Sequence, residues 1–183
     1  MALLLVDVIN AMDFPGGRAL ARHAKPAARR IQALKQRAKA ARVPVIYAND
    51  NYGQWRSDFK ATIEQALAPD KPGSEIASLL APSDDDYFVL KPKHSAFYGS
   101  VLELLLSYLG CECLVIAGFA GNFCVQFTAQ DAFLRDIEVV VARDCVASET
   151  PRANRAALEL MRTQLDASIV DASRVSFAAL RRR

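Results

Sequence analysis

The feature that most restricts the fold is a regular alternation of short apolar runs with helical patterns. The six apolar runs are Ala2–Val8, Val43–Ala48, Asp86–Leu90, Cys113–Ala117, Glu138–Ala142 and Ala167–Val170. A nearly continuous apolar run such as the first, ALLLVDV, is typical of a parallel strand buried on both faces. Because strands separated by helices form a parallel sheet covered on both sides, we predict an α/β fold, a three-layer, doubly wound, Rossmann-like six-stranded sheet.

The segments between these runs favour helices. Arg18–Arg42 has apolar residues at helical spacing and predicts a long amphipathic helix, with an interruption at Pro26 left open. The other helices are expected at Ser74–Leu80, Tyr98–Leu109, Asn122–Asp136, Pro151–Leu165 and Ser173–Leu180. A polar and aromatic loop, Asn49–Phe59, follows the second run and continues with weak helical character to Pro72. A loop of this length in a compact domain often covers or lines a site.

Composition excludes several function classes. With 183 residues, 52% of them hydrophobic, the chain fits a single domain over 1–183 with one large core. The net charge is +3, and the basic clusters at 29–42 and 181–183 have no aromatic residues interleaved for base stacking, so we expect no nucleic-acid partner. No stretch is long enough to span a membrane, and we identify no signal peptide.

Cysteine and histidine usage points to an intracellular protein without a zinc site. The four cysteines have neither CxxC spacing nor the density of a secreted scaffold, which favours a reducing cytoplasm. Only two histidines, His23 and His94, are available for a metal or for a Ser-His-Asp triad, and we set both possibilities aside. Of the cysteines we expect three to be packing residues: Cys111, Cys113 and Cys145.

Three reactive side chains follow predicted strands. Asp7, Lys91 and Cys124 come just after the first, third and fourth runs. Because the carboxyl ends of parallel strands share one edge, where such sheets bind ligands, these three side chains should meet there. A carboxylate can take the proton of a thiol, and a lysine stabilises the resulting thiolate.

The segment LVIAGFAGNFCVQFTAQD predicts a strand, a tight turn and a helix with Cys124 in its first turn. A helix N-terminus has a positive partial charge, so the thiol there is expected to ionise more easily than a free one. The alternative is that Cys124 is a small buried hydrophobe. The same turn could supply an oxyanion site, most plausibly from the backbone NH groups of Ala120 and Cys124.

Three segments resemble the isochorismatase-like cysteine hydrolases, which include nicotinamidases and N-carbamoylsarcosine amidohydrolases. They are LLLVDVIN, LKPKHSAFYGS and GFAGNFCVQFTAQDA. The resemblance implies a catalytic Asp, Lys and Cys at Asp7, Lys91 and Cys124. Lys93 is the competing lysine, and Lys91 is preferred because it stands four residues before the SAF motif. The resemblance also implies a cis Phe119–Ala120 bond and a homo-oligomer, a dimer or tetramer.

Two departures from the family pattern narrow the expectation. Many members have Thr where this chain has Gly121, and nicotinamidases have Asp and His metal ligands after the second strand, where 49–59 contains no histidine. We therefore expect no metal and no cofactor, and a substrate other than nicotinamide. Residues that could bind a small-molecule substrate are Asn49, Asn51, Tyr52, Trp55 and Phe97, although a loop packed on the surface is the alternative for the residues of 49–59.

The sequence thus predicts a cysteine hydrolase that cleaves a small-molecule amide or ureide C–N bond through a Cys124 thioester. One alternative is a non-hydrolytic binding protein that keeps the fold, since fold does not fix function. The other is vinyl ether hydrolysis of the isochorismatase type, which would not need Cys124. His94 either points into the pocket or covers it.

Overall fold

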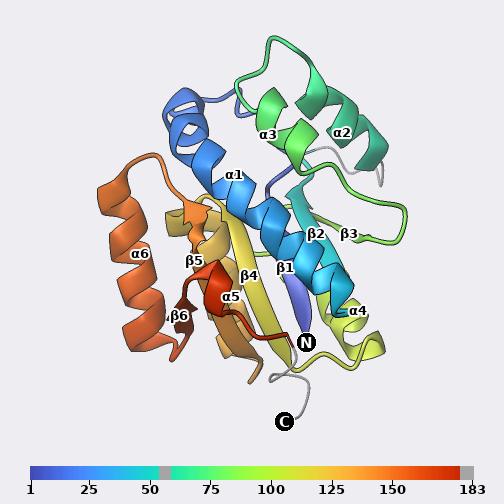
Figure 1. The fold of residues 1–183 in the computed structure, drawn as a ribbon, viewed down its shortest axis with the longest axis vertical. Helices are drawn as coiled ribbons and strands as arrows, with labels where there is room; N and C mark the ends of the chain where they lie inside the picture. The colour runs from blue at the N-terminus through green and yellow to red at the C-terminus, as the bar shows by residue number, and fades with distance from the viewer. Residues whose placement is uncertain (54–58, 178–183) are drawn as a thin grey trace.

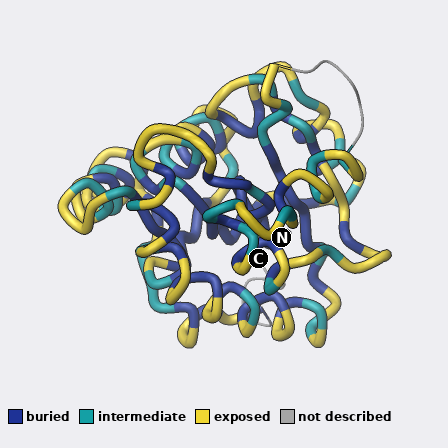
Figure 2. Tube along the Cα trace, turned by 90° about the horizontal axis from the view of Figure 1, so that it is seen from above, coloured by how far each residue is buried: buried dark blue, intermediate teal, exposed yellow. Residues whose placement is uncertain are grey.

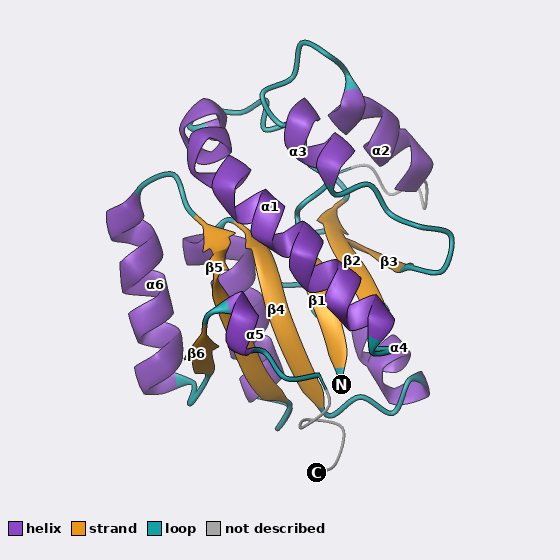
Figure 3. Cartoon of the chain, viewed as in Figure 1, coloured by secondary structure: helices purple, strands orange, loops and turns teal. Residues whose placement is uncertain are grey.

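A single parallel sheet organises the part of the chain that the computed structural model describes, residues 1–53 and 59–177. Its six strands lie in the order β3-β2-β1-β4-β5-β6, and every neighbouring pair is parallel. The strands are β1 (Ala2–Val6), β2 (Val45–Asp50), β3 (Tyr87–Lys91), β4 (Cys113–Phe119), β5 (Glu138–Ala147) and β6 (Ser168–Val170). The predicted six-stranded parallel sheet flanked by helices is confirmed (Figures 1 and 3).

Helices cover both faces of this sheet (Figure 1). They are α1 (Gly17–Ala40), α2 (Phe59–Leu67), α3 (Ser74–Leu79), α4 (Leu102–Tyr108), the π-helical turn η1 (Gly121–Val125), α5 (Gln126–Phe133), α6 (Pro151–Gln164) and the 3-10 turn η2 (Ala172–Arg174). Helix α1 passes through Pro26 without interruption. Within residues 1–53 and 59–177, none of these helices has the length and apolar character needed to cross a bilayer.

The core consists of two layers, one on each face of the sheet. Successive side chains of a strand point to opposite faces, so Leu3 and Leu5 of β1 pack with α1, whereas Leu4 and Val6 pack with α4, α5 and α6. All four are fully buried. The view from above shows the resulting buried interior surrounded by exposed helix and loop surfaces (Figure 2).

Several element boundaries differ from the prediction, and the differences are largest at β5 and at the last predicted helix. Strand β5 continues to Ala147 instead of ending at Ala142, with a register shift against β4 between Ile116 and Gly118. The predicted helix Ser173–Leu180 is wrong over its described part, where only the short turn η2 forms. The guanidinium of Arg37 donates to the carbonyls of Ala172 and Val175 at 2.6 and 2.5 Å. These two backbone oxygens therefore bond to a side chain of α1. Residues 178–180 lie outside the described part.

The sheet order positions the site. Strand β1 has β2 and β3 on one side and β4, β5 and β6 on the other. The chain builds the sheet outward from β1 to β3, and then crosses to the other side of β1 and builds outward from β4 to β6. Ligands of open α/β sheets bind outside the carboxyl ends of the strands at such a switch point. The residues that follow β1, end β3 and follow β4 therefore converge at one edge.

Candidate active site

Asp7 follows β1 directly and is held rigidly. Its backbone has a left-handed φ of 51°, which aspartate and asparagine tolerate better than most residues. The backbone NH of Asp7 donates to the Ala48 carbonyl at 2.8 Å, and its Oδ1 accepts from the Asp50 NH at 2.8 Å. With 4% of its surface exposed, Asp7 presents its second oxygen, Oδ2, for one further partner.

Lys91 supplies that partner from the last position of β3. Its Nζ lies 2.8 Å from Asp7 Oδ2, and the residue is fully buried. Strand β2 separates β3 from β1, and neighbouring strands are about 4.8 Å apart, so a long side chain is needed to cross the end of β2. Lys91 also donates to the Lys93 carbonyl at 3.1 Å, whereas Lys93 itself is an exposed residue. The geometry thus favours Lys91 over Lys93.

Cys124 lies in η1, the turn between β4 and α5. Its Sγ is 3.5 Å from Lys91 Nζ and 3.8 Å from His94 Nδ1. The His94 ring is flanked by the rings of Phe123 and Phe127, with centroids 5.5 Å away in each case. His94 is an exposed residue whose ring lies beside the thiol, and whether it points into a pocket or covers one stays a prediction.

The turn before Cys124 begins near Gly118 of β4, which lies beside Val6 of β1 in the sheet. Gly118 has a φ of 129°, and a Cβ there would lie 2.1 Å from the Val6 carbonyl oxygen, so no larger residue fits. The Phe119–Ala120 peptide bond that follows is cis. Within the turn, the NH groups of Phe123 and Val125 donate to the Ala120 carbonyl at 3.1 and 3.2 Å.

The charges of the site correct one expectation. Burial raises the pKa of the Cys124 thiol, Asp7 raises it further, and Lys91 opposes them without reversing the shift. The prediction that a helix N-terminus would ease ionisation is therefore wrong for the resting site, because burial and the neighbouring carboxylate outweigh it. Burial lowers the pKa of Lys91, but Asp7, Cys124 and Asp50 outweigh that effect and raise it. The raised pKa values of Lys91 and Cys124 favour an ammonium beside a neutral thiol in the resting site.

Comparison with known proteins places this geometry in a family. The isochorismatase domain matches residues 1–173. The chain belongs to the isochorismatase family. An uncharacterized isochorismatase family protein of Bacillus subtilis, YaaI, is 42% identical over 168 residues, which cover 92% of each chain. The ureidoacrylate amidohydrolase RutB of Methylobacterium radiotolerans is 29% identical over 88% of this chain and 72% of the relative.

A solved structure agrees with this assignment. An isochorismatase family protein of Desulfovibrio vulgaris superimposes with a TM-score of 0.75 at 27% identity, covering 94% of both chains. The predicted resemblance to the isochorismatase family is therefore confirmed, and its relatives include amidohydrolases.

Sequence reasoning missed one charged residue of this isochorismatase-family site. Asp50 ends β2, and its Oδ2 is 3.6 Å from Lys91 Nζ. Its Oδ1 accepts from the Tyr52 NH at 2.6 Å, and 30% of its side chain is exposed. Asp50 follows a strand end much as Asp7 does, so the same reasoning could have found it. Burial raises the pKa of the Tyr52 hydroxyl and the charges of Asp7, Asp50 and Cys124 add to that shift, although 44% of the residue is exposed.

The predicted substrate-binding residues occupy different environments. Asn49 is fully buried and donates through Nδ2 to the Ile9 carbonyl at 2.7 Å, while its Oδ1 has no hydrogen-bond partner among residues 1–53 and 59–177. Asn51 is half-buried and its Oδ1 accepts from the Gly53 NH. Phe97 lies in the core, 5% exposed, with the Arg135 guanidinium over its ring. Trp55 falls outside the described residues. Substrate contact by these four stays a prediction.

The three remaining cysteines are buried, in keeping with a packing role. Burial raises the pKa of Cys113 to about 11 and that of Cys145 to about 12. Within residues 1–53 and 59–177, no group of three or more His, Cys, Asp or Glu side chains is arranged to hold a metal ion.

Proposed function

We propose that this isochorismatase-family protein is a cysteine hydrolase that cleaves an amide or ureide C–N bond of a small molecule through a Cys124 thioester. One observation carries the proposal: Lys91 Nζ lies 2.8 Å from Asp7 Oδ2 and 3.5 Å from Cys124 Sγ. A base, a cation and a nucleophile from three different strand ends thus meet at one point. The amidohydrolase among the relatives supports the bond class.

The first half of the reaction forms the thioester. Asp7 takes the proton of the Cys124 thiol as the sulfur attacks the substrate carbonyl carbon. Because the pKa of the thiol is raised, proton transfer and attack are coupled, and free thiolate does not accumulate. The tetrahedral oxyanion accepts hydrogen bonds from the NH groups of Ala120 and Cys124. When the C–N bond breaks, Asp7 returns the proton to the leaving nitrogen.

The second half releases the acid. Asp7 takes a proton from a water molecule, whose oxygen attacks the thioester carbonyl carbon. The C–S bond breaks, the carboxylic acid leaves, and Asp7 returns the proton to the sulfur of Cys124. Lys91 Nζ lies 2.8 Å from Asp7 Oδ2, where its ammonium stays in contact with the side chain that accepts and returns the protons. No cofactor takes part in this scheme.

Replacement of Cys124 tests the proposal. Ammonia release is measured over a panel of primary amides and ureides for the wild-type protein, Cys124→Ala and the control Cys111→Ala. Cys111 is a buried cysteine at the opposite edge of the sheet, before the start of β4. We expect turnover by the wild type and the control, a thioester adduct in quenched wild-type samples, and no turnover by Cys124→Ala. Undiminished ammonia release by Cys124→Ala would refute the thioester mechanism.

A further inference from the structure

A chain of hydrogen bonds leads away from the nucleophile turn into the loop between β5 and α6. Ser148, 1% exposed, accepts from the Asn122 NH at 3.2 Å through its Oγ. The Ser148 hydroxyl donates to Asn154 Oδ1 at 3.0 Å. Asn154, in the first turn of α6, in turn donates through Nδ2 to the Val146 carbonyl at 3.2 Å. The chain therefore begins at the turn and ends on β5.

The direction of every bond in this chain is fixed by its ends. A backbone NH only donates, so Ser148 Oγ must accept from Asn122 and use its own hydrogen elsewhere. The Val146 carbonyl only accepts, so the amide nitrogen of Asn154 must face it. Asn154 Oδ1 is then left to receive the Ser148 hydroxyl. With each group in its one compatible role, the chain defines a single arrangement of the turn.

We infer that Ser148 and Asn154 are positioning residues that hold the nucleophile turn in its reactive geometry. This inference rests on the proposed function. Asn122 lies between Ala120 and Cys124, the residues whose NH groups are assigned to the oxyanion. Tying the Asn122 NH to Ser148 fixes the peptide plane between them, while the Phe123 and Val125 NH groups are already held by the Ala120 carbonyl.

The same chain accounts for the glycine at position 121, where many family members resembled by this sequence have threonine. A Cβ on Gly121 would lie 2.4 Å from Asn154 Oδ1, 2.7 Å from Val146 Cγ1 and 2.9 Å from Ser148 Oγ. Ser148 and Asn154 are the two side chains of the hydrogen-bond chain, and Val146 supplies the carbonyl at its end. Gly121 is therefore required by the hydrogen-bond chain behind it, and a side chain there would displace Asn154 from Ser148.

The test compares Ser148→Ala with Thr150→Ala, a matched control in the same loop. Thr150 caps α6 by accepting from the Ala153 NH, and within the described part of the chain its side chain makes no hydrogen bond to the nucleophile turn. Both variants lose one hydrogen bond and are expected to melt at similar, slightly lowered temperatures. Ser148→Ala should lose about 10- to 100-fold in kcat, because small displacements of reacting groups are costly. Its KM should stay within about twofold, and Thr150→Ala should keep both constants.

A second measurement separates this inference from the proposed function. The rate of Cys124 alkylation by iodoacetamide, at matched pH, needs no substrate and should change in Ser148→Ala but not in Thr150→Ala. Failure of the wild type to hydrolyse any amide would refute the proposed function and leave this readout intact. Equal alkylation rates in the wild type and both variants, or equal kcat losses in both variants, would overturn the positioning role.

A double substitution tests the link to Gly121. If a side chain at this position acts by displacing Asn154, Gly121→Ala and Asn154→Ala should not add, and the double variant should lose no more kcat than the worse single variant. Additive losses would show that Gly121 and Asn154 act separately, which contradicts the inference.

Discussion

The two ends of strand β3 each bury a lysine against carboxylates, and their difference separates a structural network from a reactive one. At the amino end, Asp86 precedes the strand and pairs with Lys35 of α1 at 2.7 Å. At the carboxyl end, Lys91 pairs with Asp7 at 2.8 Å. Both lysines are buried, 7% and 0% exposed. Burial of a paired lysine therefore does not by itself identify a catalytic site.

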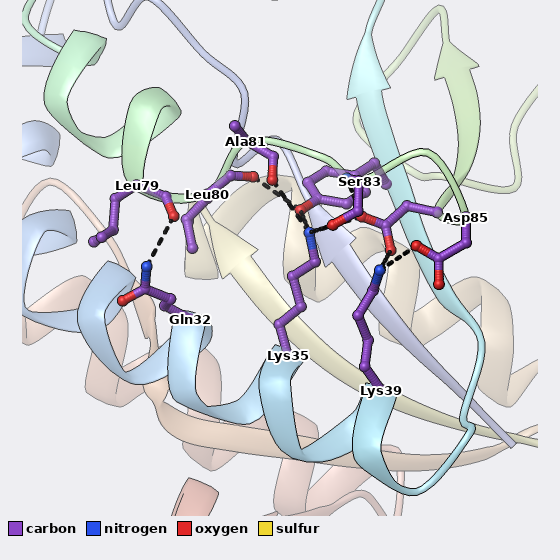
Figure 4. A network of polar contacts seen from close by, with 10 residues as sticks. Gln32, Lys35, Lys39, Leu79, Leu80, Ala81, Ser83 and Asp85 are labelled. Atoms are coloured by element: carbon purple, nitrogen blue, oxygen red, sulfur yellow. Dashed lines mark hydrogen bonds and ion pairs between the residues drawn. The ribbon is translucent and has the colours of Figure 1, made fainter.

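The partners of Lys35 are all fixed within the protein (Figure 4). Besides Asp86, its Nζ donates to the Tyr47 hydroxyl at 2.8 Å and to the Ala81 carbonyl at 3.2 Å. The Tyr47 hydroxyl donates in turn to the Leu80 carbonyl at 2.8 Å. These bonds join α1 to β2 and to the segment that leads into β3. Lys35 Nζ also donates to the Ser83 hydroxyl at 3.5 Å, and among the described residues its hydrogen-bond and ion-pair partners include no thiol.

Lys91 differs from Lys35 in two of its neighbours. One is the Cys124 thiol, whose proton can be removed, and the other is Asp50, which is partly exposed. This cluster also lies at the carboxyl edge of the sheet, where ligands enter. A reactive group and access to solvent, rather than a buried charge, therefore distinguish the candidate active site at the carboxyl end of β3 from the network at its amino end.

Neutralising the carboxylate at each end gives the largest expected contrast. Asp7→Asn removes the proposed base and should lower kcat by about 100- to 10,000-fold, the usual contribution of general acid–base catalysis. Asp86→Asn makes the same chemical change at the amino end and should leave kcat per folded molecule unchanged. Initial rates of ammonia release, normalised to the folded fraction from circular dichroism, measure both. Similar losses in the two variants would erase the distinction.

Removing the structural lysine should cost stability and spare turnover. Lys35→Met leaves the side chain of Asp86, which is fully buried, with Lys39 as its remaining cation at 3.1 Å. Breaking a buried pair in this way costs about 3 kcal/mol in the free energy of unfolding. Urea denaturation measures that loss, and kcat at saturating substrate should match the wild type. A Lys35→Met protein that is stable but inactive would contradict the structural assignment.

The pH dependence of Cys124 alkylation should move in opposite directions when its two charged neighbours are replaced. Asp7 raises the pKa of the thiol and Lys91 lowers it. Asp7→Asn should therefore lower that pKa and speed alkylation at neutral pH, although it lowers kcat, whereas Lys91→Met should raise the pKa and slow alkylation. Mass spectrometry assigns the modified cysteine at each pH. Shifts of the same sign in both variants would show that this description of the charges is wrong.

The smallest effect is expected at Tyr47. Tyr47→Phe removes a hydroxyl that accepts from Lys35 and donates to Leu80, and it should lower the free energy of unfolding by about 1 kcal/mol. Tyr108→Phe is the matched control, because Tyr108 is 82% exposed and its substitution should change stability by less than about 0.5 kcal/mol. Thermal melts of both variants check this, and a larger loss in the control would show that the network adds nothing.

The sequence predicted the sheet and the meeting of three reactive side chains at one edge, because the ends of strands can be located from apolar patterning. Asp7, Lys91 and Cys124 each stand beside such an end, and parallel strands place those ends together. The uninterrupted course of α1 through Pro26 could not be predicted, since packing along the rest of a long helix decides whether it continues. Arg143 and Asp144 resemble the end of a strand, but pairing with β4 carries β5 on to Ala147.

The finer features of the site could not be predicted from the sequence, because they depend on burial and on the orientation of side chains. A helix N-terminus predicts easier ionisation of Cys124, whereas burial and Asp7 set the opposite direction of its pKa. Asn49 was one of the polar residues expected in the pocket, yet its amide donates to the Ile9 carbonyl, and its neighbour Asp50 lies near Lys91. Alternation along a strand decides which of two adjacent side chains faces a site, and that depends on the register.

The left-handed backbone of Asp7 limits which sequences can encode this site. At a φ of 51°, glycine, asparagine and aspartate are the residues that fold with least strain. A library randomised at position 7 and sorted for soluble protein should be enriched in these three, and a second sort for activity should retain aspartate alone. Glutamate has the same acid chemistry but should be lost at the first sort. Backbone conformation would thus decide which acid this position can use, before catalysis selects among the survivors.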